Sequence, residues 1–141
     1  MGQQLATFSV GSMHFGVDVL EVQEVLREQA MTHIPTAPEV VRGLINLRGQ
    51  IVTAIDMRMR LRLPPLESGP PLMNMIIRTE DGAASLLVDE IGDVIEVSDS
   101  SYEECPENLA PSVREIVLGV HKMKESLLLL LDTAKALDVS S

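Results

Sequence analysis

Short apolar runs bounded by glycine, proline and charged residues recur along the chain, a pattern typical of strands in an all-β protein. Eight of these runs form four predicted hairpins, which pair 7–11 with 13–17, 44–47 with 50–55, 73–79 with 84–88, and 118–123 with 126–131. Two single strands are predicted at 22–26 and 93–97. The passages around Pro35, Pro38, Pro106 and Pro111 are predicted loops, because proline cannot donate a hydrogen bond to a strand ladder.

The chain also repeats this order of elements. Residues 43–56 align without a gap on residues 119–132, with Gly opposite Gly at the start and Asp opposite Asp at the end. Residues 21–26 match residues 90–95 in the same order. We therefore predict that one unit of about 60 residues is duplicated.

The last strand of each unit, 51–55 or 127–131, is apolar on both faces and must be covered on both. A short predicted helix follows each of them, at 56–61 and 132–137, with Asp56 or Asp132 as its N-cap. The sequence thus predicts one domain over 1–141, made of two pseudo-symmetric five-stranded β-barrels. We place subdomain 1 at about 5–62, a proline-rich crossing linker at 63–71, and subdomain 2 at about 72–138.

Composition indicates an aliphatic core, since the chain has no Trp, one Tyr and two Phe. The single cysteine, Cys105, cannot form an intramolecular disulfide, which favours a reducing, cytoplasmic location. The N-terminus lacks a signal-peptide pattern, and the apolar run 127–131 falls far below the roughly 20 residues that span a bilayer. We expect no direct membrane insertion.

The net charge of −10 argues against a nucleic-acid partner, because nucleic acids are bound mainly by Lys and Arg. The charge is unevenly distributed. Five of the eight arginines lie between residues 42 and 62, whereas residues 80–115 hold eleven acids and one base. These regions are either complementary docking surfaces or ordinary solvated faces.

No constellation for catalysis, metal binding or cofactor binding stands out. His14, His33 and His121 have no metal-ligand spacing, and phosphate-binding loops and nucleophile elbows are missing from the sequence. We therefore expect a protein without enzymatic activity, cofactor or metal. A small-ligand-binding barrel and an enzyme that uses surface carboxylates stay open as alternatives.

Three motifs resemble the CheW family of chemotaxis coupling proteins. They are Val22-Gln-Glu-Val25, Ile34-Pro-x-x-Pro38 and Gly43-Leu-Ile-Asn-Leu-Arg-Gly49, and the stretch from Leu87 to Val94 is similar to the family's second half. The resemblance runs from Leu5 to Leu137. It implies two SH3-like barrels around a shared core, in agreement with the repeat.

The resemblance also implies a function. We expect a cytoplasmic adaptor that couples a CheA-like histidine kinase to the cytoplasmic tips of chemoreceptors, in arrays at the inner face of the membrane. The kinase's regulatory domain shares the fold, so the two proteins are expected to alternate in rings, and the receptor's helical hairpin is expected to lie between the barrels. A scaffold of a non-motility chemosensory pathway would share these features.

The family's functional positions carry over to particular residues of this chain. The expected receptor groove consists of Val22, Glu24, Val25, Ile51, Val52, Thr53, Leu87, Ile91, Gly92 and Val94. The expected kinase contacts are Arg42, Leu44 and Leu47. Arg48 is expected to pair with Glu24, and Gly49 is expected to supply the positive φ of the turn. The acidic segment 99–107 has no counterpart in the first half.

Overall fold

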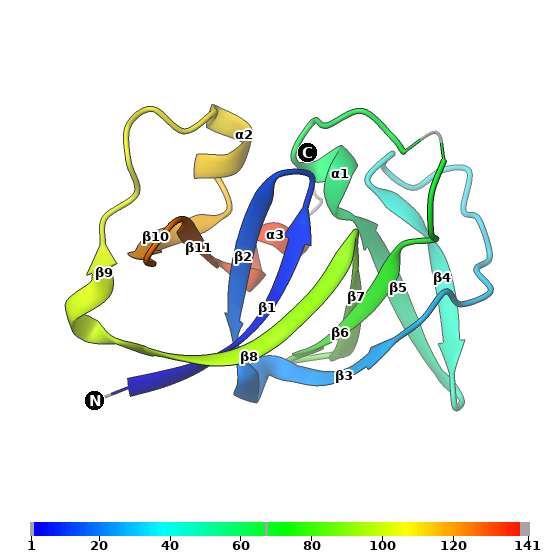
Figure 1. Ribbon diagram of the computed structural model, residues 1–141. Helices are drawn as coiled ribbons and strands as arrows, with labels where there is room; N and C mark the ends of the chain where they lie inside the picture. Colours follow the sequence, from blue (N-terminus) through cyan, green and yellow to red (C-terminus); the bar gives the residue numbers. More distant parts are fainter. Residues whose placement is uncertain (1, 67, 139–141) are drawn as a thin grey trace.

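Over residues 2–66 and 68–138, the computed structural model contains two β-sheets and three short α-helices (Figure 1). Sheet A has six strands in the order β8-β1-β2-β11-β10-β9, and sheet B has five in the order β3-β6-β7-β5-β4. The predicted all-β class is confirmed, although one sheet gains a sixth strand, the two-residue β9. Residue 67 of the predicted linker lies outside the described residues.

Each predicted run lies within or overlaps a strand, although β1, β4 and β8 begin earlier than the predicted 7–11, 44–47 and 93–97. Those of sheet A are β1 (Gly2–Val10), β2 (Met13–Asp18), β8 (Glu90–Ser98), β9 (Tyr102–Glu103), β10 (Val117–Lys122) and β11 (Leu127–Leu131). Those of sheet B are β3 (Val22–Leu26), β4 (Val41–Leu47), β5 (Gln50–Asp56), β6 (Met73–Thr79) and β7 (Gly82–Val88). Short 3₁₀ helices, η1 (Val19–Glu21) and η2 (Asp99–Ser101), precede β3 and β9.

The sheets do not divide the chain at the expected linker 63–71. The first hairpin, β1–β2, pairs with β8 and β11, whereas the hairpin β6–β7 pairs with β3 and β5. Sheet B is therefore built from the continuous segment 22–88, and sheet A from the segments on either side of it. This corrects the predicted subdomain bounds: the proline-rich segment connects two parts of sheet B, and the chain crosses between sheets at η1 and at Asp89.

The predicted duplication is nevertheless present in detail. β3 and β8 carry bulges at matching positions, opposite Ile77/Ile76 and Phe8/Ala6 respectively. β4 and β10 carry the second matching pair of bulges, between Val41 and Gly43 and between Val117 and Gly119. Each half has thus exchanged its first hairpin with the other half while keeping the same internal irregularities.

Three apolar clusters hold the fold together. The largest, here the central core, lies between the two sheets and includes Phe8 and Phe15 from sheet A and Met75, Ile77 and Leu86 from sheet B. A second cluster lines the opposite face of sheet B, and a third lines the opposite face of sheet A. Because residues of both sheets fill the central core, neither sheet can bury its inner face alone.

Two α-helices begin at the predicted N-cap aspartates, and a third α-helix was not predicted. Asp56 accepts a hydrogen bond from the Met59 amide at the start of α1 (Met57–Arg60), and Asp132 accepts one from Lys135 at the start of α3 (Thr133–Leu137). The predicted loop at Pro111 is wrong for residues 111–114, which form α2 (Pro111–Arg114). Proline suits the first turn of a helix, whose amides have no intrahelical partner in any case.

Candidate functional site

The turn between β4 and β5 closes sheet B through an ion pair. β3 and β4 are the two edge strands of this sheet, and Arg48 at the turn donates a hydrogen bond to the carboxylate of Glu24 on β3. Nearby, Thr32 and Leu44 exchange two backbone hydrogen bonds of 2.9 Å. The predicted Glu24–Arg48 pair is present, and it joins the edges of one barrel.

The turn itself has the geometry of a two-residue hairpin. Arg48 has φ of 52° and Gly49 has φ of 89°, and the Gly49 amide donates to Asn46 Oδ1 at 3.0 Å. Positive φ at both central residues is the combination that matches the twist of paired strands. The prediction for Gly49 is confirmed, and Arg48 also adopts the left-handed conformation.

The same ion pair affects the ionisation of Glu24. The hydrogen bond from Arg48 lowers the pKa of Glu24, a contact from Gln23 adds to this, and partial burial opposes both. The carboxylate therefore stays charged to lower pH than a free glutamate would. It can hold Arg48 in place over the whole neutral range.

Seven of the predicted groove residues lie on or beside the sheet faces that enclose the central core. In sheet B, Val22, Val25 and Thr53 are on the same face as Ile77 and Met75, as their pairing shows. Ile51, two residues before Thr53, shares that face. In sheet A, Ile91 and Val94 pair with Phe8 and Ala6, and Gly92 lies in the bulge between them. β3 and β8 both run along the lower side of Figure 1.

Exposure increases outward from this core. Val22 and Ile91 are partly buried against the central cluster, whereas Val25, Ile51 and Val94 are 40, 60 and 55 % exposed. Apolar side chains exposed at the open ends of two facing sheets form a surface suited to an amphipathic partner. Gly92 is required for packing, since a Cβ there would lie 2.5 Å from Thr7 Oγ1.

Two predicted groove residues lie on the opposite face of sheet B. Val52 and Leu87 are buried in the second cluster, on the face of sheet B that turns away from the central core. Side chains alternate between faces along a strand, so neighbours of Ile51 and Val88 necessarily face the opposite side. Neither side chain is available to a docked partner, which corrects the prediction for both residues.

The three predicted kinase contacts also differ in their exposure. Arg42 on β4 is exposed and its Nη2 lies 2.6 Å from Asp56 Oδ2, while Leu44 is half-buried. Leu47 is buried in the second cluster beside Ile45, which excludes it as a direct contact. Arg42 and Leu44 stay predictions.

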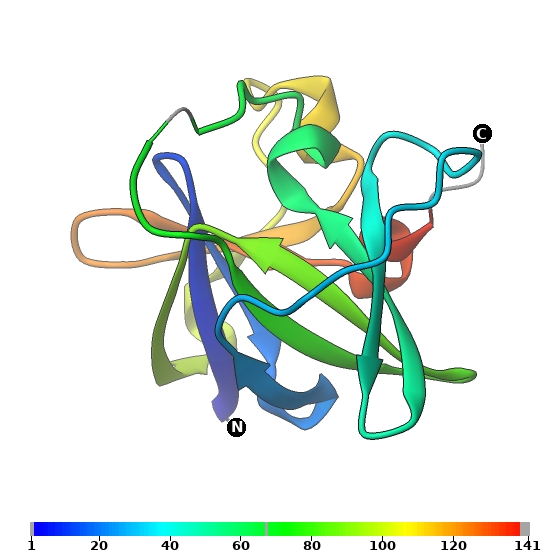
Figure 2. The same cartoon turned by 90° about the vertical axis from the view of Figure 1, so that its right-hand side faces the viewer.

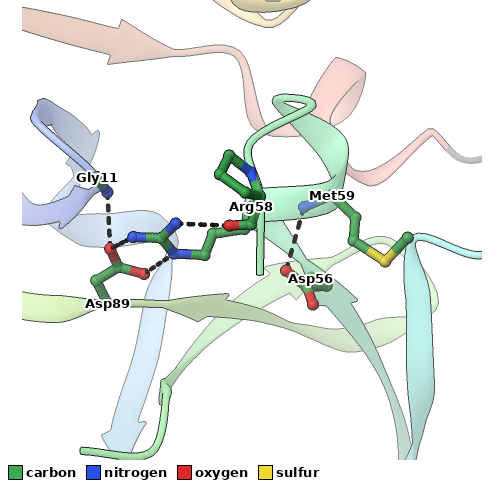
Figure 3. Close-up of polar contacts among 6 residues, drawn as sticks. Gly11, Asp56, Arg58, Met59 and Asp89 are labelled. Atoms are coloured by element: carbon green, nitrogen blue, oxygen red, sulfur yellow. Dashed lines mark hydrogen bonds and ion pairs between the residues drawn. The ribbon is translucent and has the colours of Figure 1, made fainter. Parts of the chain in front are cut away.

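One arginine of the basic region 42–62, for which a docking surface and a solvated face were the two alternatives, is used inside the molecule (Figure 3). Arg58 on α1 binds both carboxylate oxygens of Asp89, at 2.9 and 2.6 Å, and the Gly11 amide donates to the same carboxylate at 2.7 Å. The Arg58 and Asp89 side chains are only 12 and 14 % exposed. Sequence reasoning missed this contact because nothing local to either residue indicates a partner 31 positions away.

Other chemistry is limited in the part of the chain that the structure describes. His121 is buried with Nδ1 2.8 Å from Ser101 Oγ, and burial lowers its pKa although Asp99 opposes the shift. Residues 2–66 and 68–138 contain no cluster of three His, Cys, Asp or Glu side chains that could hold a metal ion. None of the described helices is long and apolar enough to cross a membrane.

Comparison with known proteins identifies the family. The model of the CheW-like domain matches residues 4–141, almost the entire chain. The chain belongs to the CheW-like domain family.

Individual CheW proteins show how close the similarity is. The chain is 34 % identical to the chemotaxis protein CheW of Treponema pallidum over 136 residues, which cover 94 % of this chain and 80 % of the relative. It is 31 % identical to CheW of Bacillus subtilis over 140 residues, covering 99 and 90 % of the two chains. The crystal structure of the scaffolding protein TtCheW from Thermoanaerobacter tengcongensis superposes with a TM-score of 0.83 at 27 % identity, covering 93 and 89 %.

Proposed function

We propose that this chain is a chemotaxis adaptor that couples a CheA-like histidine kinase to the cytoplasmic helical hairpin of chemoreceptors. The observation that carries the proposal is the partly exposed apolar surface of Val22, Val25, Ile51, Ile91 and Val94, placed by both sheets around one core. A helix that lies on this surface would contact both sheets at once. Family membership supports the same role.

The kinase is proposed to dock at Arg42 and Leu44 of β4, at the edge of sheet B opposite to the edge formed by β3. An adaptor with two separate sites on one rigid body can alternate with a partner of the same fold and build rings. Such rings would hold the protein at the inner face of the membrane through the receptors.

Binding to a receptor fragment tests the receptor site. Val25→Glu places a charge on the apolar surface, and we expect at least about tenfold weaker binding of the receptor hairpin, because a buried unpaired charge opposes docking. Isothermal titration calorimetry measures the affinity. Met59→Glu is the matched control, since Met59 is similarly exposed at 37 % but lies on α1. Equal affinity of both variants with the unmodified protein would contradict the proposed site.

Arg48→Glu tests the closing ion pair of sheet B. The substitution puts two carboxylates side by side, so β3 and the β4–β5 turn should separate. We expect receptor-dependent kinase activation in a reconstituted array to fall several-fold while the circular dichroism spectrum stays that of a β protein. Arg48→Lys, which keeps the charge, should retain most of the activity. Unchanged activation by the glutamate variant would remove the pair from the mechanism.

A further inference from the structure

Helix α1 directly follows β5 of sheet B in the chain, but through Asp89 it is also connected to sheet A. Besides binding Asp89, Arg58 donates from Nη1 to the Pro64 carbonyl at 2.8 Å, which fixes the guanidinium in one orientation (Figure 3). The Asp89 amide donates to the Ser9 carbonyl of β1 at 3.0 Å, and its carboxylate accepts from the Gly11 amide in the β1–β2 turn. Asp89 is thus held by α1 on one side and by sheet A on the other.

A second arginine of α1 makes contacts of the same kind. Arg60 donates to the Lys135 carbonyl of α3 at 3.1 Å, and its Nη1 lies 3.5 Å from Glu115, next to α2. Ser112 of α2 in turn donates to the Leu61 carbonyl at 3.1 Å. Figures 1 and 2 show α1 and α2 side by side at the same end of the molecule. Side-chain contacts from α1 thus reach Asp89, α3 and the residue next to α2.

At the other crossing of the chain, the contact from the neighbouring α-helix is of a different kind. At η1, which joins β2 to β3, the Thr133 hydroxyl of α3 donates one hydrogen bond of 2.7 Å to Glu21. By the repeat, Thr133 corresponds to Met57 and Glu21 to Glu90, so this contact lies one residue from the positions that correspond to Arg58 and Asp89. A planar, two-bond arginine–carboxylate pair fixes both distance and angle, whereas a single hydroxyl bond fixes mainly distance.

We propose that Arg58 and Asp89 form a clamp that sets the angle between the two sheets and thereby the width of the receptor surface. Asp89 is the one residue between β7 and β8, so its position determines where β8 begins. Ile91 and Val94 follow on β8, while Val22 and Val25 are carried by sheet B together with α1. Loosening the clamp lets one side of the surface move relative to the other. The inference rests on the proposed receptor site.

Two mild substitutions test the clamp. Asp89→Asn keeps the side-chain shape and an acceptor for Gly11 but removes the charge, and Arg58→Lys keeps the charge but loses the two-bond geometry. If about a tenth of the loosened molecules hold the competent angle, receptor affinity falls about tenfold. Affinity for the kinase regulatory domain should change less than twofold, because Arg42 and Leu44 lie within sheet B. Calorimetry with both partners measures this difference.

A distance measurement provides the second readout. Spin labels at Arg27→Cys, just after β3, and Glu96→Cys, on β8, in a Cys105→Ser background report the separation of the two sheets by double electron–electron resonance. We expect a broader distance distribution in Asp89→Asn and in Arg58→Lys. Glu103→Gln is the control, since it breaks the exposed Lys122–Glu103 pair within sheet A and should change neither the distance nor the affinities.

Particular outcomes separate the two proposals. An unchanged distance distribution and unchanged receptor affinity in folded Asp89→Asn would overturn the clamp. If the unmodified protein fails to bind the receptor fragment, the proposed function fails, and the distance distributions still decide whether the clamp orients the sheets. A broader distribution with equal losses for receptor and kinase domain would mean that the pair acts through general stability, which also overturns the inference.

Discussion

Replacing Phe8 by alanine should lower the free energy of unfolding by about 3–5 kcal/mol, the usual cost of removing a buried phenylalanine side chain. Phe8 is 1 % exposed and stacks on Phe15, with ring centroids 5.3 Å apart and planes inclined by 13°. Both rings come from the hairpin β1–β2 and fill the central core between the sheets. Since domains of this size are stable by roughly 5–15 kcal/mol, the loss is a large fraction of the total.

Urea denaturation followed by circular dichroism measures this loss. Because both sheets line the central core, we expect a single transition that moves to lower urea concentration without a change of slope. Ile51→Ala is the control, since Ile51 is 60 % exposed on the inner face of sheet B and its truncation should cost no more than about 0.5 kcal/mol. Two separate transitions, or a loss from Phe8→Ala below 1 kcal/mol, would contradict the shared core.

The strands and hairpins could be predicted from the sequence because their signals are local. Alternation, turn residues such as Gly49 and the N-cap aspartates Asp56 and Asp132 all act within a few residues. The pseudo-symmetry could be predicted for the same reason, because the repeat consists of short segments with similar residues. α2 was missed because proline at a first helical position and proline in a loop give the same pattern.

The exchange of hairpins could not be predicted in this way. A hairpin that joins its own half and one that joins the other half have the same alternation and the same turns. What decides between them is the parallel pairing of β2 with β11 and of β5 with β7, which involves residues far apart in sequence.

In the candidate site, too, features set by local residues could be predicted and features set by strand pairing could not. The Glu24–Arg48 pair and the turn followed from motif residues, and both are in the structure. The positions of Val52, Leu87 and Leu47 did not follow, because a family motif names residues on both faces of a strand. Only the register with neighbouring strands decides which of them face the receptor surface.

Arg58→Met should destabilise the protein by about 3 kcal/mol at neutral pH, because it leaves Asp89 charged, nearly buried and without its partner. The Gly11 amide alone cannot replace two hydrogen bonds from a cation. The double variant Arg58→Met/Asp89→Asn removes both charges and should lose clearly less than the single variant. Equal losses in the single and double variants would show that the ion pair is not the cause.

The effect should depend on pH with a defined sign. Burial by itself raises the pKa of Asp89, but the hydrogen bonds from Arg58 and the Gly11 amide outweigh it and hold the pKa below its ordinary value of 3.8. In the unmodified protein this carboxylate therefore adds stability above about pH 4 and loses it as the pH falls through the lowered pKa. Without Arg58, burial dominates and raises the pKa of Asp89, so that protonation relieves the penalty in acid. The difference in unfolding free energy between Arg58→Met and the unmodified protein should thus be largest near pH 7 and shrink toward pH 4 in urea titrations. A difference that stays constant over this range would assign the loss to packing of the arginine side chain.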